Sequence, residues 1–64
     1  MKISYDKVAG ALYVTILENT KVVESQEVKD GVILDLDINN QLVGIEILTH
    51  LDPKLEADIK NISI

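Results

Sequence analysis

The chain has 64 residues, a net charge of -5 and no cysteine. This length predicts a single domain over residues 1–64, too small to hold a cofactor-binding domain beside a substrate domain. The lack of cysteine excludes disulfides, thiolate metal sites and cysteine nucleophiles. Because 11 acidic residues face only 6 lysines, binding to nucleic acid or to an acidic membrane is disfavoured, and a basic partner is favoured.

The sequence also lacks targeting and spanning segments. No apolar run approaches the roughly 20 residues that span a bilayer, and residues 1–6 lack the apolar stretch of a signal peptide. We therefore expect a cytoplasmic protein. A domain of about 60 residues buries too little surface to be more than marginally stable, and oligomerisation is the usual remedy. We therefore also expect a homodimer.

Turn signals divide the first 48 residues into short segments rich in Ile, Leu and Val, which favour strands. The signals are Asp6–Gly10, Asn19-Thr20, Asp30-Gly31 and Asn39-Asn40. They predict five strands, at residues 2–5, 11–17, 22–28, 32–37 and 42–48. Because the links are short, we expect an antiparallel β-meander over residues 1–48.

The alternation of apolar residues predicts the register of this sheet. A turn at Asn39-Asn40 places three apolar pairs on one face: Leu36 with Val43, Leu34 with Ile45, and Val32 with Ile47. In the same way, Ile3 faces Val14, Tyr5 faces Leu12, and a turn at Asn19-Thr20 places Ile16 opposite Val23. These twelve residues form the predicted core face. Gly44, opposite Asp35, predicts a kink or a close-packing point.

The third strand fits this pattern worst. A two-residue turn at Asp30-Gly31 would place Ser25 and Glu27 on the apolar face. Either a bulge intervenes or the strand is partly exposed, and the sequence leaves both possibilities open.

The last segment changes from strand to helix signals. Asp52 is a helix N-cap followed by Pro53 at the first helical position, so we expect a helix over residues 52–60. Leu55, Ile59 and Ile62 recur at helical spacing, and this stripe would cover part of the apolar face. The fold class is therefore α+β, a five-stranded antiparallel β-meander with one short C-terminal helix.

Three acidic residues are the candidate metal ligands. Asp35, Asp37 and Glu46 share the second predicted face, where carboxylates could bind Ca²⁺ or Mg²⁺. The simpler interpretation is a solvated face that keeps the protein soluble. His50, the one histidine, has no sequence neighbour that defines a catalytic pair. We therefore assign no catalytic residue, cofactor or metal.

Six residues on the second face and its margins are candidates for a contact surface, because a tyrosine ringed by aliphatic side chains is typical of interfaces. They are Tyr13, Leu17, Val22, Ile33, Leu42 and Leu48.

Three stretches carry a family resemblance: Tyr5-Asp6 with Ala9 and Ala11–Tyr13, then Asp30–Asp35 with Asp37, then Val43–Leu48. Over residues 1–48 the chain resembles the small prokaryotic domain-of-unknown-function family 2283. The family has no established activity, so the resemblance adds no mechanism. Because some members lie beside small toxin-like genes, it implies an antitoxin-like or regulatory role.

These observations favour a non-enzymatic interaction or regulatory module, with a homodimer or a small basic protein as its partner. The alternative is a small-molecule or divalent-metal-binding module that uses the acidic face of Asp35, Asp37 and Glu46.

Overall fold

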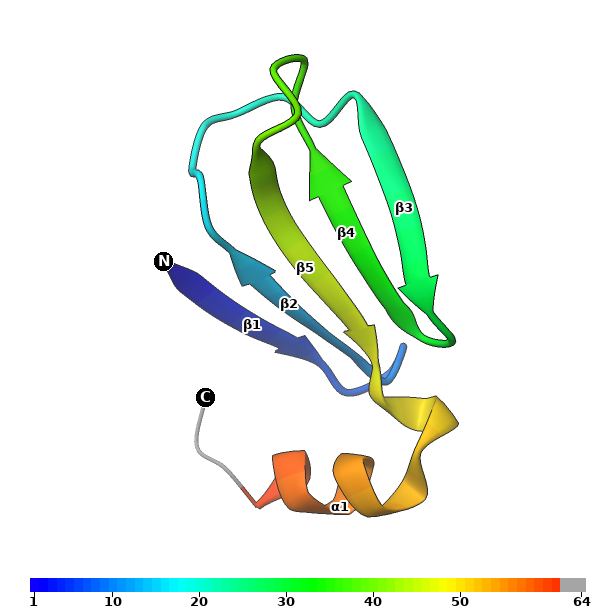
Figure 1. Ribbon diagram of the computed structural model, residues 1–64. Helices are drawn as coiled ribbons and strands as arrows, with labels where there is room; N and C mark the ends of the chain where they lie inside the picture. Colours follow the sequence, from blue (N-terminus) through cyan, green and yellow to red (C-terminus); the bar gives the residue numbers. More distant parts are fainter. Residues whose placement is uncertain (62–64) are drawn as a thin grey trace.

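The computed structural model describes residues 1–61, which form one five-stranded sheet and a helical C-terminal segment (Figure 1). The strands are β1 (Lys2–Asp6), β2 (Ala11–Thr15), β3 (Glu24–Lys29), β4 (Val32–Leu36) and β5 (Leu42–Leu48). A short 3₁₀ helix, η1 (Thr49–Leu51), leads into α1 (Pro53–Lys60). The predicted α+β class, with five antiparallel strands and one C-terminal α-helix, is confirmed. Within the described residues, no helix is long and apolar enough to cross a membrane.

The order of strands is β1-β2-β5-β4-β3, so β2 and β3 are not neighbours. The predicted pairing of Ile16 with Val23 is therefore wrong: Ile16 N donates to Val43 O on β5, and Val23 N donates to Leu36 O on β4. The composition of the strands explains this order. All six residues of β3 are exposed, and its polar sequence suits an edge, whereas β5 brings apolar residues to the centre of the sheet.

Most of the predicted register is confirmed. Ile3 pairs with Val14, Tyr5 with Leu12, Val32 with Ile47, and Leu34 with Ile45. The pairing shifts between Asp35 and Leu36, so Leu36 lies opposite Leu42 and not opposite Val43 as predicted. Both explanations left open for the third strand hold, since a shift separates Glu27 from Lys29 and the whole strand is exposed. This shift places Ser25 opposite Asp35 and removes it from the apolar face.

Residues opposite one another on neighbouring strands share a face, so the ladders define two faces. The first, here called the apolar face, carries Ile3, Tyr5, Leu12, Val14, Val32, Leu34, Ile45 and Ile47, with Gln26 and Lys29 of β3 at its edge. The second, here called the tyrosine face, is formed by Ser4, Tyr13, Thr15, Ser25, Glu27, Ile33, Asp35, Gly44 and Glu46.

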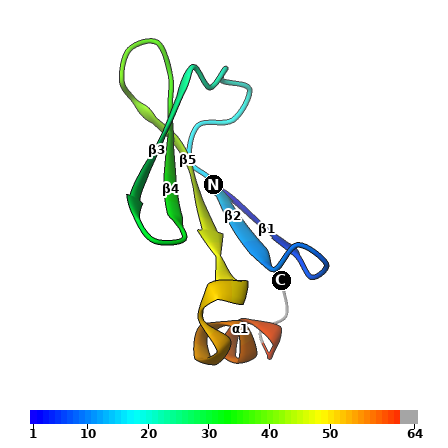
Figure 2. The ribbon, with the colours of Figure 1, turned by 90° about the vertical axis from the view of Figure 1, so that its right-hand side faces the viewer.

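The helix reaches only one end of the apolar face, where Leu55 lines a groove together with Val32 and Ile47. It lies across one end of the sheet, beyond the end of β5 and close to the β1–β2 turn (Figures 1 and 2). The reason is the short connection: η1 begins directly after β5 and is held at the β1–β2 turn, where Thr49 Oγ1 donates to Gly10 O at 2.9 Å. Of the twelve predicted core residues, only Leu36 and Val43 are buried. Ile59 of α1 is also buried.

The start of α1 follows the sequence signals. Asp52 Oδ1 accepts hydrogen bonds from Lys54 N at 3.1 Å and Leu55 N at 3.2 Å, and Pro53 occupies the first turn. These contacts satisfy main-chain donors that a helix N-terminus leaves unpaired. The predicted helix over residues 52–60 is confirmed, with Asp52 as its cap; Ile62 of the predicted apolar stripe lies outside the described residues.

Candidate functional site: an open apolar face and a tyrosine–aspartate bridge

The apolar face is only partly covered by the described elements. Its residues alternate along β1, β2, β5 and β4 as the β-branched and aliphatic pattern requires. They are half-buried, apart from Ile3, which is 47 % exposed. A sheet face of this composition normally packs against a second layer. The residues predicted as a core are therefore a surface in the isolated chain.

A groove continues this face toward the helix. It has a volume of about 350 Å³, and Val32 and Ile47 of the apolar face line it. The helical segment contributes Leu51, Pro53 and Leu55. Three charged residues also line it, Lys29, Asp30 and Asp52, so its walls combine apolar and polar surface, with an excess of carboxylates over lysine.

The total surface of the chain supports this description. The molecule exposes 4603 Å², whereas a compact monomer of 7.1 kDa is expected to expose about 4,100 Å². The excess of about 500 Å² is of the same order as the roughly 800 Å² that one partner buries in a standard interface. The chain is therefore less compact than an average monomer of its mass.

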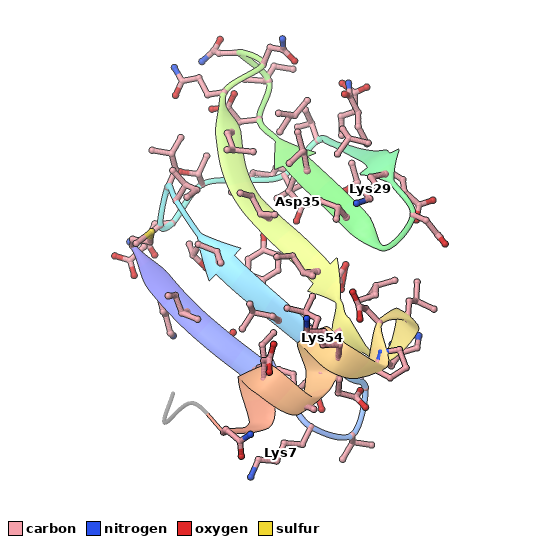
Figure 3. The ribbon with its side chains drawn as sticks, turned by 60° about the horizontal axis from the view of Figure 1, so that its bottom comes forward. Lys7, Lys29, Asp35 and Lys54 are labelled. Atoms are coloured by element: carbon pink, nitrogen blue, oxygen red, sulfur yellow. The ribbon has the colours of Figure 1, made fainter. Side chains whose placement is uncertain are left out.

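On the opposite side, Tyr13 and Asp35 belong to a hydrogen-bonded cluster of side chains. Tyr13 Oη donates to Asp35 Oδ2 at 2.7 Å, and Ser25 Oγ donates to Asp35 Oδ1 at 2.6 Å. Figure 3 labels Asp35 on β4, toward the middle of the sheet. Three strands, β2, β3 and β4, thus supply one hydrogen-bonded cluster that reaches over β5.

Gly44 makes this cluster possible. A Cβ atom at Gly44 would lie 2.7 Å from Cζ and 2.9 Å from Cε1 of Tyr13, which is closer than carbon atoms can approach. The tyrosine ring therefore rests directly on the backbone of β5. The predicted close-packing point at Gly44 is confirmed, and its neighbour is Tyr13.

The environment of Tyr13 changes its acidity. The hydrogen bond to Asp35 raises the pKa of Tyr13 to about 12, helped by burial and by the negative charges of Asp35 and Glu46. The phenol therefore stays protonated at neutral pH and acts as a hydrogen-bond donor.

The structure does not bring the three predicted metal ligands together. Asp37 Oδ1 accepts from Asn39 N and Gln41 N, both at 2.8 Å, and so holds the β4–β5 turn. Both oxygens of Asp35 accept hydrogen bonds within its own cluster. Glu46 lies opposite Tyr13 and Ile33 on the tyrosine face. Among the described residues, no group of three acidic, histidine or cysteine side chains is placed to hold a metal ion.

His50 of η1 contacts the β1–β2 turn. Its main-chain N donates to Gly10 O at 3.2 Å, and its ring Nδ1 lies 3.3 Å from the same oxygen. Gly10 has φ +65°, and a Cβ there would lie 2.8 Å from Cβ of His50. The contacts of His50 thus join η1 to the turn.

The six predicted contact residues differ in their exposure and do not form one exposed surface. Tyr13 is half-buried, and its hydroxyl bonds to Asp35. Val22 is 38 % exposed, whereas Leu17, Ile33 and Leu48 are half-buried. Leu42 pairs with Leu36 because of the shift in register. The sequence interpretation missed the Tyr13–Asp35 bridge, since it did not place β5 between β2 and β4.

Comparison with known proteins gives one result. No curated protein and no solved structure matches the chain. A family model described as "Protein of unknown function (DUF2283)" matches residues 2–49, the segment that runs from β1 to the first residue of η1. The expected resemblance is confirmed, and the chain belongs to the DUF2283 family of proteins of unknown function.

Proposed function

We propose that this protein is a non-enzymatic protein–protein interaction module whose contact surface is the apolar face together with its groove. The observation that carries the proposal is the half-buried row of apolar residues at the centre of the sheet, Val14, Ile45 and Leu34. Burying apolar surface of this kind gains roughly 25 cal/mol per Å². A partner that covered the face would supply the second layer that the fold lacks.

The charge of the chain supports a basic partner. The net charge is -5, and the groove is lined by two carboxylates, of Asp30 and Asp52, against one lysine, Lys29. Complementary charge at the edge of an apolar contact steers association and selects partners. The occupant proposed here is therefore a small basic protein that presents apolar side chains to the face.

This proposal gives a concrete form to an antitoxin-like role in the cytoplasm. A protein that covers a basic partner with an acidic, apolar surface would block that partner's own contacts with anionic ligands such as nucleic acid. Support for this form comes from the charge of the chain and from its family resemblance. The partner need only be basic and carry an apolar patch.

The experiment uses two adjacent residues of β5 that face opposite sides. A photo-crosslinking amino acid replaces Ile45, on the apolar face, or Glu46, on the tyrosine face. In native cells we expect the probe at position 45 to label a protein of basic isoelectric point, and the probe at position 46 to label it weakly. The labelled protein is then purified and its affinity for the unmodified chain is measured by calorimetry.

Two variants with the same new residue test the assignment. Ile45→Ser is expected to weaken binding of the purified partner at least tenfold, and Glu46→Ser less than twofold. Raising the salt concentration from 50 to 300 mM should weaken binding further, because charge contributes to the association. Labelling of an acidic protein, of only a second copy of this chain, or of equal targets from both positions would overturn the proposal.

A further inference from the structure

The two edges of the sheet differ in how well they can accept another strand. Natural proteins blunt exposed edges with bulges and charged side chains. The β3 edge has such a feature, since its register shifts between Glu27 and Lys29. The β1 edge pairs with β2 without interruption from Lys2 to Asp6. Among residues 1–61, no strand pairs with the outer side of β1.

The turn after β1 shows which main-chain groups point outward. Asp6 O accepts a hydrogen bond from Gly10 N at 2.8 Å, so the carbonyl of Asp6 points toward the β2 side. Because these directions alternate along a strand, the N–H and C=O groups of Ile3 and Tyr5 point away from β2. The outer edge therefore offers two donors and two acceptors, which is the pattern that an antiparallel partner needs.

We propose that β1 is a self-recognition strand through which two copies of this chain pair antiparallel, with a two-fold axis at Ser4. The sequence of β1 is Lys-Ile-Ser-Tyr-Asp, and it is complementary to itself when reversed. Lys2 faces the partner's Asp6, Ile3 faces the partner's Tyr5, and Ser4 faces the partner's Ser4. Opposite-charge, aromatic–β-branched and hydroxyl pairs are the cross-strand pairs that stabilise antiparallel sheets.

Side-chain spacing strengthens the charge pairing. The outward groups of Ile3 and Tyr5 make the hydrogen-bonded pairs, so Lys2 and the partner's Asp6 occupy a non-hydrogen-bonded pair, where side chains lie closest. The smallest shift that keeps the outward main-chain groups opposite one another is two residues, and it would separate both ion pairs and place either Lys2 or Asp6 opposite the partner's Ser4. The register with Ser4 at its centre is therefore selected over its neighbours.

Self-complementarity is the property that a two-fold interface requires, since each strand must present the same surface to its copy. An unrelated strand would have no reason to match both charges and the central serine. The occupant is thus a second copy of this chain, bound at an edge that is separate from the apolar face. The inference goes beyond the proposed function, because the paired sheets would present two apolar faces on the same side.

Cysteine substitution tests the register directly, because the chain contains no cysteine. Ser4→Cys would place two thiols on residues with Cα atoms about 4.5 Å apart, within the range that a disulfide spans. Lys7→Cys in the β1–β2 turn is the matched control, because it leaves both ion pairs intact and its two copies are offset by six residues, roughly 20 Å. In a glutathione redox buffer we expect Ser4→Cys to form a covalent dimer at least tenfold faster.

A second measurement does not depend on a disulfide. Sedimentation equilibrium of the unmodified chain should give a mass of twice 7.1 kDa as concentration rises. Lys2→Glu should raise the dimer dissociation constant at least threefold, because it places like charges opposite one another, and Lys21→Glu should leave it unchanged. Equal cross-linking of both cysteine variants, or a monomer at every concentration, would overturn the inference. Neither result depends on whether a basic protein binds the apolar face.

Discussion

Tyr13 Oη and Asp35 Oδ2 are joined by a 2.7 Å hydrogen bond, although their strands, β2 and β4, are separated by β5. The bond crosses β5 at Gly44, the position where a side chain is missing. The tyrosine face is thus held together by a contact between strands that share no main-chain hydrogen bonds. Its members offer direct tests of how the sheet is stabilised.

Gly44→Ala should destabilise the fold by about 1–3 kcal/mol, because the added methyl group would displace the ring of Tyr13 and weaken its bond to Asp35. Urea denaturation measures this loss. In a Tyr13→Val background the same change should cost much less, since the obstructing ring is absent. Equal costs in the two backgrounds would show that Tyr13 and Gly44 are not coupled.

Tyr13→Phe should lower the free energy of unfolding by about 1 kcal/mol, because the half-buried Asp35 would lose one of its two hydrogen-bond donors. Thermal unfolding monitored by circular dichroism gives the measurement. Ser25→Ala removes the other donor from a fully exposed strand and should cost less.

Stability should also fall between pH 10 and pH 12. The pKa of Tyr13 is raised from 10.0 to about 12 in the folded chain, so the unfolded chain loses this proton first as the pH rises. The stabilisation is complete below pH 10 and is lost as the pH approaches 12. Absorbance at alkaline pH should show one tyrosine that ionises late, and Tyr13→Phe should abolish that late step. A late step that survives in Tyr13→Phe would show that it does not belong to Tyr13.

Tyr5→Phe is expected to stabilise the fold, in contrast to Tyr13→Phe. The hydroxyl of Tyr5 is buried and has no hydrogen-bond partner among the described residues. A buried polar group without a partner costs about 1–3 kcal/mol, so its removal should raise the melting temperature. A lower melting temperature for Tyr5→Phe would reveal a partner for this hydroxyl.

Thr49→Val should lower the free energy of unfolding by about 1 kcal/mol, because it keeps the shape of a fully buried side chain but removes the donor to Gly10 O. Chemical denaturation measures the change. Thr20→Val is the control, since the hydroxyl of Thr20 bonds to Glu18 O at the surface. Equal losses of stability in both variants would show that the hydrogen bond from Thr49 to Gly10 stabilises the fold no more than an exposed one.

Local signals in the sequence determined most of the elements. Alternating apolar residues and turn residues predict five strands, and Asp52-Pro53 predicts the start of α1. The hairpin pairs of Ile3 with Val14 and of Leu34 with Ile45 follow as well, because the residues on both sides of a short turn fix its register. The position of Gly44 indicated close packing, although its neighbour was not identified.

Only the tertiary structure decided which strands are neighbours when they are distant in the sequence. The link from residue 16 to residue 23 was predicted to be a hairpin, yet β5 inserts between β2 and β4. A polar strand loses little at an exposed edge, whereas β5 gains apolar neighbours on both sides, and this balance depends on the whole sheet. For the same reason, neither the Tyr13–Asp35 bridge nor the partly covered apolar face could be predicted from local patterns: both depend on contacts between segments distant in sequence.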